Sequence, residues 1–122
     1  MNVSFLQIKV DEWVKATFGD NVRSNIKERA LRLAEEVIEF AQSVEVDPEQ
    51  LKRLVDYVYS RPIGQPDQEI AGSMVTLLAA ANAIGVDVAQ VTRSELRRIN
   101  TRQVMEKCRR RQDEKRAALV TK

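Results

Sequence analysis

The sequence has 122 residues, of which 43% are apolar and 31% are charged, and its formal net charge is +2. This length fits one domain with a single core, over residues 1–122. Histidine is absent and Cys108 is the one cysteine, which excludes histidine-based nucleophilic catalysis, an internal disulfide and a thiolate metal cluster, so any chemistry must use carboxylates, lysines, arginines and bound water.

Helix starts are the clearest local signals in the chain. A capping residue followed three positions later by Glu or Gln satisfies two backbone N–H groups that would otherwise lack acceptors. Four pairs fit this pattern: Ser4 with Gln7, Asn25 with Glu28, Asp47 with Gln50, and Asp87 with Gln90. Pro48 strengthens the third start, Asp67 after Pro66 is expected to cap a further helix, and Gly85 is expected to end that helix.

The apolar spacing between these signals predicts five helices and no strand. Their expected ranges are about 4–18, 25–44, 48–59, 68–84 and 88–116. Short connections favour an all-α fold, an antiparallel bundle of about five helices. The helix at 68–84 is apolar nearly all round, so we expect it at the centre of the bundle or in a subunit interface, and we expect a homo-oligomer, either a homodimer or a homotetramer.

The chain shows no sign of a membrane or a secretory route. No apolar run reaches the roughly 18–20 residues that a transmembrane helix needs. The N-terminal stretch lacks a basic region followed by an apolar block, so we expect a cytoplasmic protein that does not use a membrane.

Three carboxylates crowd the helix expected at 25–44. Glu35 and Glu39 stand at i,i+4 and Glu36 and Glu39 at i,i+3, and each such pair is repulsive by roughly 0.2–0.5 kcal/mol. Arg32 can reach Glu35 or Glu36, but no basic helical neighbour serves Glu39. A divalent cation is the obvious counter-charge, and the alternative interpretation is a solvated acidic face.

Glu69 is a fourth carboxylate without a basic residue at i±3 or i±4. If its helix packs antiparallel to the one at 25–44, carboxylates from both can converge on one or two Mg²⁺ or Mn²⁺ ions. Such ions activate water and neutralise charge on phosphate oxygens, which favours hydrolysis at phosphorus.

The order of these residues resembles a known family. Glu35-Glu36-x-x-Glu39, then Glu69-x-x-Gly72 about thirty positions later, resembles the MazG-like all-α nucleoside triphosphate pyrophosphohydrolase superfamily, whose motif is EExxE followed by ExxD. With VDYVYSRPIGQPDQEIAGSM and ELRRIN, the chain looks more narrowly like the phage and prophage dATP/dGTP pyrophosphohydrolase branch, over residues 25–116.

The resemblance implies cleavage of a nucleoside triphosphate, here purine dNTPs such as dGTP and dATP, between the α and β phosphates. The products are the monophosphate and pyrophosphate, and the cofactor is Mg²⁺ or Mn²⁺. By position, Glu36, Glu39 and Glu69 are implied as metal ligands, and Glu35 as a further ligand or as the residue that orients the attacking water. A phage origin would place the protein in the host cytoplasm.

Gly72 departs from the family pattern, which has aspartate there. One ligand is then missing or is supplied from elsewhere, with Asp56 or a water as the first alternatives. The number of metals stays open. A degenerate member that binds nucleotide without cleaving it is also consistent with Gly72.

The end of the chain is basic. Residues 93–122 contain eleven basic and four acidic side chains, while residues 1–92 contain nine basic and fourteen acidic ones. Lys107, Arg111 and Lys115, together with Arg61 near the prolines, are candidate contacts to a triphosphate. The alternative is a solvated helix, or a noncatalytic module that binds nucleic acid through this tail. The acidic front argues against nucleic acid as a partner.

Two further residues are candidates for substrate binding. Trp13 can stack on a base, but a single tryptophan on an amphipathic helix is more often part of a core. Asn82 stands within the apolar helix at 68–84 and needs a partner if it is buried, so it can contact a base edge or satisfy a backbone group.

Overall fold

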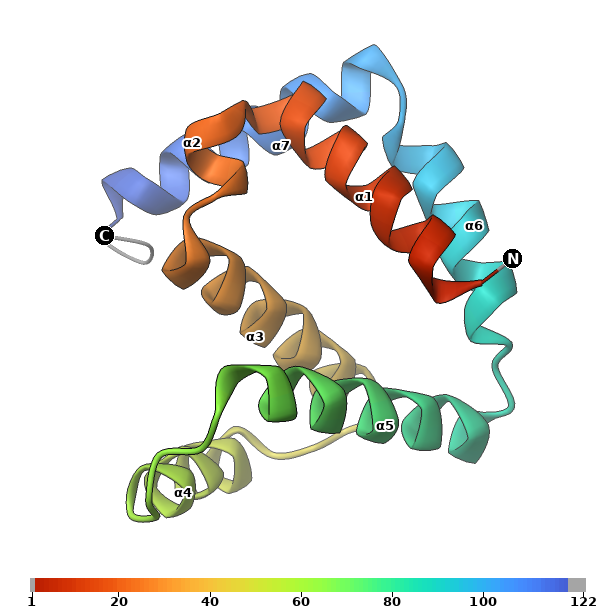
Figure 1. Cartoon of the computed structure of the whole chain (residues 1–122). Coiled ribbons are helices and arrows are strands. Elements are labelled where there is room, and N and C mark those ends of the chain that lie inside the picture. Colours follow the sequence, from red (N-terminus) through yellow and green to blue (C-terminus); the bar gives the residue numbers. More distant parts are fainter. Residues whose placement is uncertain (1, 119–122) are drawn as a thin grey trace. The chain divides into compact units, whose positions relative to one another are not determined.

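The computed structural model describes residues 2–118, and all of its regular structure is helical, which confirms the predicted all-α class. Seven helices follow one another in this part of the chain, where the sequence predicted five (Figure 1). Their bounds are α1 Val3–Phe18, α2 Asp20–Arg23, α3 Ile26–Ser43, α4 Pro48–Tyr59, α5 Pro66–Ile84, α6 Val88–Ile99 and α7 Arg102–Ala117.

The chain divides into two units. Unit 1 contains residues up to 33 and from 89 onward, and thus α1, α2, the start of α3, nearly all of α6, and α7. Within it, α1 packs against α2 and α7 (Figure 1). Unit 2 contains residues 34–88, and thus the rest of α3 together with α4 and α5.

Two of the predicted helix starts are present as expected. The Asp47 side chain accepts a first-turn backbone N–H at 2.8 Å, and the Gln50 side chain accepts the Asp47 N–H at 3.1 Å. Pro48 occupies the first helical position of α4, where its missing N–H costs nothing. At the start of α3, Asn25 Oδ1 accepts the backbone N–H of Glu28 at 3.1 Å.

Two other predicted caps are wrong. Asn2, not Ser4, caps α1 and accepts a backbone N–H at 2.8 Å, because asparagine caps as well as serine and the earlier start lengthens the helix. The helix α5 begins at Pro66, before Asp67, and has no side-chain cap. A proline at the first position leaves fewer N–H groups in need of an acceptor. Gly85 ends α5 in the left-handed region, with φ 73°, as predicted.

The short helix α2 was not predicted, because four residues are too few to show a helical period. Gly19, with φ 83°, ends α1 and turns the chain into α2, and its N–H donates to the Lys15 carbonyl at 2.9 Å. Val22 is buried at 6% exposure, and Arg23 donates to both carboxylate oxygens of Asp11 at 2.6 and 2.8 Å. The hydrogen bond from Arg23 lowers the pKa of Asp11.

The single helix predicted at 88–116 is wrong, because the chain breaks between α6 and α7. The carbonyl of Ile99 accepts the indole N–H of Trp13 at 2.9 Å, and Asn100 lies outside both helices. Thr101 then caps α7 by accepting the N–H of Val104 at 3.3 Å. A contact to a residue 86 positions earlier and a new cap together favour two helices over one.

A buried polar network holds α7 in unit 1. Glu28 is 4% exposed, and its carboxylate accepts two hydrogen bonds from Arg116, at 2.9 and 2.8 Å, and one from Gln112 at 3.0 Å. The same contact raises the pKa of Arg116. Nearby, Arg109 Nε donates to the Thr17 carbonyl at 2.7 Å. These bonds join residues more than 80 positions apart, so they fix the tertiary arrangement of unit 1.

Unit 2 has almost no interior of its own. Among its residues only Ala81 is buried. Large apolar side chains on all three of its helices are about half exposed or more, among them Val37 at 55%, Leu54 at 54%, Ile70 at 65% and Val75 at 66%. The apolar faces predicted for these helices therefore exist, but the helices of unit 2 do not cover one another's faces.

Candidate functional site

The three carboxylates of the EExxE motif lie on the second half of α3, inside unit 2. Glu35 is half-buried, and Glu36 and Glu39 are exposed. Among residues 2–118, no hydrogen bond or ion pair reaches the carboxylate of Glu39, as its helical neighbours predicted. Glu39 is thus an exposed negative charge with free oxygen ligands.

Glu69 lies in the first turn of α5, also in unit 2 and also exposed. Its side chain folds back over the backbone of Gly64 in the proline-containing loop before the helix. A Cβ at position 64 would overlap the Glu69 carboxylate, whereas a Cβ at Gly72 would meet nothing within 4 Å. The glycine at position 64 therefore makes room for the Glu69 carboxylate.

The single chain does not bring the four carboxylates together. Within residues 2–118, no group of three or more cysteine, aspartate or glutamate side chains lies close enough to hold a metal ion. The helices α3 and α5 do not pack against each other along their length, so the expected antiparallel pairing is not formed in this part of the chain. Asp56, the alternative ligand, is an exposed residue of α4.

The chemistry of these donors nevertheless suits a hard divalent cation. Carboxylate oxygens are the ligands that Mg²⁺ and Mn²⁺ prefer, and Glu36, Glu39 and Glu69 are exposed to solvent from which such an ion is taken up. The four carboxylates come from two helices of one unit, but they stay apart in the part of the chain that the structure describes.

Arg61 and Asn82 lie in the same unit as the carboxylates. The guanidinium of Arg61 stacks over the ring of Tyr57, with its central carbon 4.8 Å from the ring centroid, and donates to the Tyr57 hydroxyl at 3.3 Å. Asn82 is exposed on α5, and its backbone carbonyl accepts the N–H of Gly85 at 3.2 Å. Because Asn82 is not buried, its amide needs no protein partner and can contact a ligand.

The predicted phosphate contacts of the tail lie on α7, in unit 1. Lys107 and Arg111 are exposed, and Lys115 is half-buried. Gln112 and Arg116 lie on the side of α7 that faces the interior of unit 1, where they contact Glu28. Sequence reasoning missed this network. The signal was present, because Gln112 and Arg116 stand at i,i+4 on one face, but a basic run is usually solvated.

Trp13 is half-buried in unit 1. The sequence allowed either a buried core residue or an exposed residue that stacks on a base, and the observed exposure lies between these two. Its ring meets Phe18 edge to face, with the centroids 5.7 Å apart, and its N–H donates to the Ile99 carbonyl. Part of the indole borders an open pocket between α1 and α6. Trp13 therefore has a structural contact and also a surface that a ligand can reach.

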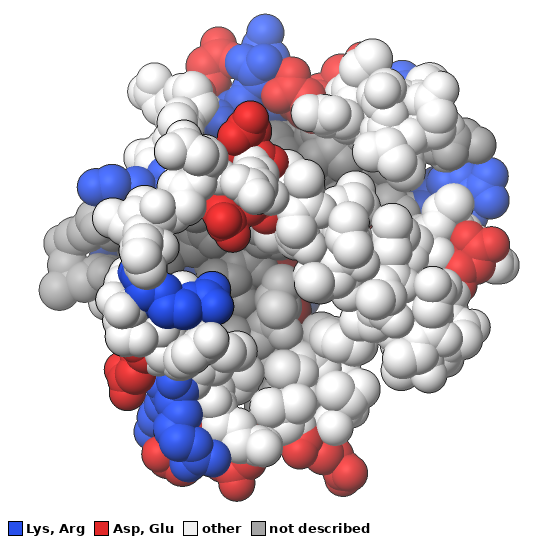
Figure 2. Space-filling view, turned by 60° about the horizontal axis from the view of Figure 1, so that its bottom comes forward, with Lys and Arg blue, Asp and Glu red and all other residues white. Residues whose placement is uncertain are grey.

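Charged side chains are dispersed on the face of the molecule drawn in Figure 2. Lysines and arginines and the acidic residues form small separate patches among a larger area of uncharged residues. On that face no broad basic surface of the kind that binds a nucleic-acid backbone is seen.

Within residues 2–118, no single helix has both the length and the apolar composition that crossing a bilayer requires, and α5 and α6 meet this requirement only when they are taken together.

Comparison of the chain with protein-family models gives no match, and comparisons with curated proteins and with solved structures give no significant match.

Proposed function

We propose that the protein is a metal-dependent nucleoside triphosphate pyrophosphohydrolase that acts on purine dNTPs. The observation that carries this proposal is the placement of Glu39 and Glu69, two exposed carboxylates in one unit, within the spacing EExxE and then ExxG. Glu39 has no contact among residues 2–118 that would neutralise it, so a cation is the natural counter-charge.

The resemblance to the EExxE and ExxD motif suggests a role for each carboxylate. Glu36, Glu39 and Glu69 would hold Mg²⁺ or Mn²⁺, which would supply charge neutralisation at the phosphate oxygens and a more acidic water. Glu35, next to the ligands and half-buried, would orient the attacking water. Arg61, held over Tyr57 in the same unit, is placed to contact a phosphate as a planar fork.

A second copy of the chain would complete the proposed site. The helices of unit 2 leave large apolar side chains about half exposed or more. A copy that covered these side chains would remove their apolar surface from water.

The location of the uncovered apolar surface also favours self-association. The exposed apolar side chains of α3 and α5, such as Val37 and Val75, share their helices with the proposed metal ligands. A second copy that covered these faces would exclude water beside Glu39 and Glu69. Association and completion of the site would then be one event.

Turnover with defined products tests the proposal. The protein is incubated with each dNTP and Mg²⁺ or Mn²⁺, and we expect monophosphate and pyrophosphate in equal amounts. Glu39→Gln should lower kcat by at least about a hundredfold, because an amide is a poor ligand for the metal. The matched control is Glu49→Gln, which changes an exposed glutamate of α4 paired with Lys52 and should retain activity.

Two results would contradict the assignment. Release of inorganic phosphate with the diphosphate would show that another bond is cleaved. Equal rates for Glu39→Gln and the unchanged protein would show that the motif carboxylate holds no essential metal. Circular dichroism of the variant separates loss of catalysis from loss of helix.

A further inference from the structure

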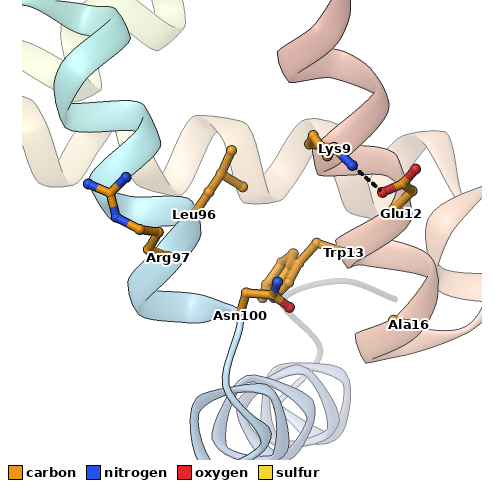
Figure 3. Close-up of a pocket in the computed structure, with 7 residues that line it drawn as sticks. All are labelled: Lys9, Glu12, Trp13, Ala16, Leu96, Arg97 and Asn100. Carbon is orange, nitrogen blue, oxygen red and sulfur yellow. Dashed lines mark hydrogen bonds and ion pairs between the residues drawn. The ribbon is translucent and has the colours of Figure 1, made fainter.

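Unit 1 contains a pocket of about 360 Å³ between α1 and α6, and none of the residues that line it belongs to unit 2. Figure 3 shows its walls, with Lys9, Glu12 and Trp13 on α1 and Leu96 and Arg97 on α6, and with Asn100 just after α6. The volume is within the range of small-molecule sites, at about 300–1,000 Å³.

Trp13 gives this pocket a rigid planar wall. The indole N–H donates to Ile99 at 2.9 Å, and the ring packs edge to face on Phe18 at 5.7 Å. Both contacts hold the ring before any ligand arrives, so little side-chain entropy remains to be lost on binding. A ring face held in this way is suited to stacking on another planar ring.

The polar groups of the pocket are few and specific. The amide of Asn100, which Figure 3 shows next to Trp13, makes no side-chain hydrogen bond within residues 2–118 and offers a donor beside an acceptor. Lys9 pairs with Glu12 at 3.4 Å on the α1 side. Arg97 extends along α6 and donates to Ser94 at 3.3 Å, and it makes no ion pair within the same residues. Figure 3 shows the guanidinium of Arg97 on the side of α6 away from Trp13, so Lys9 is the cation nearer to the indole ring.

We infer that this pocket binds the base of a nucleotide, stacked on Trp13 and contacted at its edge by Asn100. A nucleobase has a flat ring and a polar edge, and the phosphate it carries suits the ammonium of Lys9 on the α1 wall of the pocket. The site uses no residue of the α3 and α5 motifs. The proposed base-binding site is an addition to the proposed hydrolysis, and each of the two can be tested without the other.

The chain offers a direct probe, because Trp13 is its single tryptophan. Intrinsic fluorescence is measured during titration with dAMP, in EDTA so that no divalent ion takes part. The Asn100 amide matches the donor and acceptor on the edge of adenine, which is the reason for this probe. We expect saturable quenching by dAMP, weaker quenching by deoxyadenosine, and none by deoxyribose 5-phosphate.

Variants separate stacking from folding. By calorimetry, Trp13→Leu should weaken dAMP binding about tenfold or more, and Trp13→Phe should retain most of the affinity because a ring is still present. Lys9→Gln should weaken dAMP binding severalfold and leave deoxyadenosine binding unchanged. Lys15→Gln, on the same helix and outside the pocket, is the matched control and should behave as the unchanged protein.

Three outcomes would overturn the inference. The first is no spectral change up to millimolar dAMP, and the second is equal quenching by deoxyribose 5-phosphate, which would indicate an anion site without base stacking. The third is emission that depends on protein concentration and not on dAMP, which would assign the pocket to self-association. Quenching by dAMP should persist in Glu39→Gln, so a failure here is distinguishable from a failure of the proposed hydrolysis.

Discussion

The two units of the molecule are stabilised in different ways. Unit 1 contains a buried carboxylate, Glu28, whose acceptors are satisfied by Arg116 and Gln112 from the other end of the chain. Unit 2 has no comparable interior, since among its residues only Ala81 is buried while Ile70 and Val75 are about two-thirds exposed. The unit with the proposed metal ligands is the one with almost no buried residues.

This difference predicts that the two proposed sites respond differently to self-association. Long-range polar bonds fix unit 1 within one chain, so its Trp13 pocket is complete in a monomer. The apolar faces of unit 2 provide a large driving force for association, at about 25 cal/mol per Å² of apolar surface removed from water. The carboxylate site should therefore depend on protein concentration, and the Trp13 pocket should not.

The largest effect is expected from a charge on the apolar face of α5, which tests whether unit 2 associates with a second copy. Val75→Glu would place an unpaired carboxylate in the proposed interface, and we expect the dissociation constant of the oligomer to rise by about a hundredfold or more. Activity should fall at the same protein concentrations. Analytical ultracentrifugation across a dilution series measures the effect.

The matched control for this charge is Gln103→Glu, on the exposed surface of α7, which should leave the mass unchanged. If the wild-type protein is active and remains a monomer at every concentration, the site does not require a second copy.

The next largest effect is expected inside unit 1. Glu28→Gln removes the charge that Arg116 and Gln112 contact, and about 2 kcal/mol of unfolding free energy should be lost. The loss is moderated because the Arg116 side chain is 39% exposed and regains water. Urea unfolding followed by Trp13 emission measures unit 1 specifically.

An exposed ion pair on α7, the helix that carries Arg116 and Gln112, provides the control. Glu106→Gln breaks a pair with Arg102 whose two side chains are 48% and 94% exposed, and it should change the unfolding free energy by less than about 0.5 kcal/mol. Equal losses in the two variants would show that the Glu28 network contributes no more than a surface pair.

Most helices of both units could be predicted from local signals, but the short helix α2 and the contacts between helices could not. Asp47 and Gln50 lie three positions apart, so the start of α4 is visible in the sequence. Glu28 and Gln112 are 84 positions apart, and nothing near either residue indicates the partner. The break after Ile99 was missed for the same reason, because its cause is the distant Trp13.

The candidate site shows the same limit. Residue types and spacing identify Glu35, Glu36, Glu39 and Glu69 as a set. The helices that carry them, α3 and α5, do not pack along each other within residues 2–118. The proposed contact with a second copy has no periodic signal in one sequence beyond an excess of apolar residues, which α5 displays.

The smallest effect, and the sharpest test of unit 2, concerns the loop that positions Glu69. Gly64→Ala would place a methyl group where the Glu69 carboxylate lies, and the flexible end of that side chain would move to relieve the overlap. Stability should change little, while kcat should fall about tenfold because a misplaced ligand no longer meets its metal. Gln65→Ala is the matched control, since it shortens the exposed neighbouring side chain, which makes no capping hydrogen bond. Equal activity of the two variants would show that the Gly64 backbone does not position Glu69, and steady-state kinetics at saturating Mn²⁺ distinguishes the outcomes.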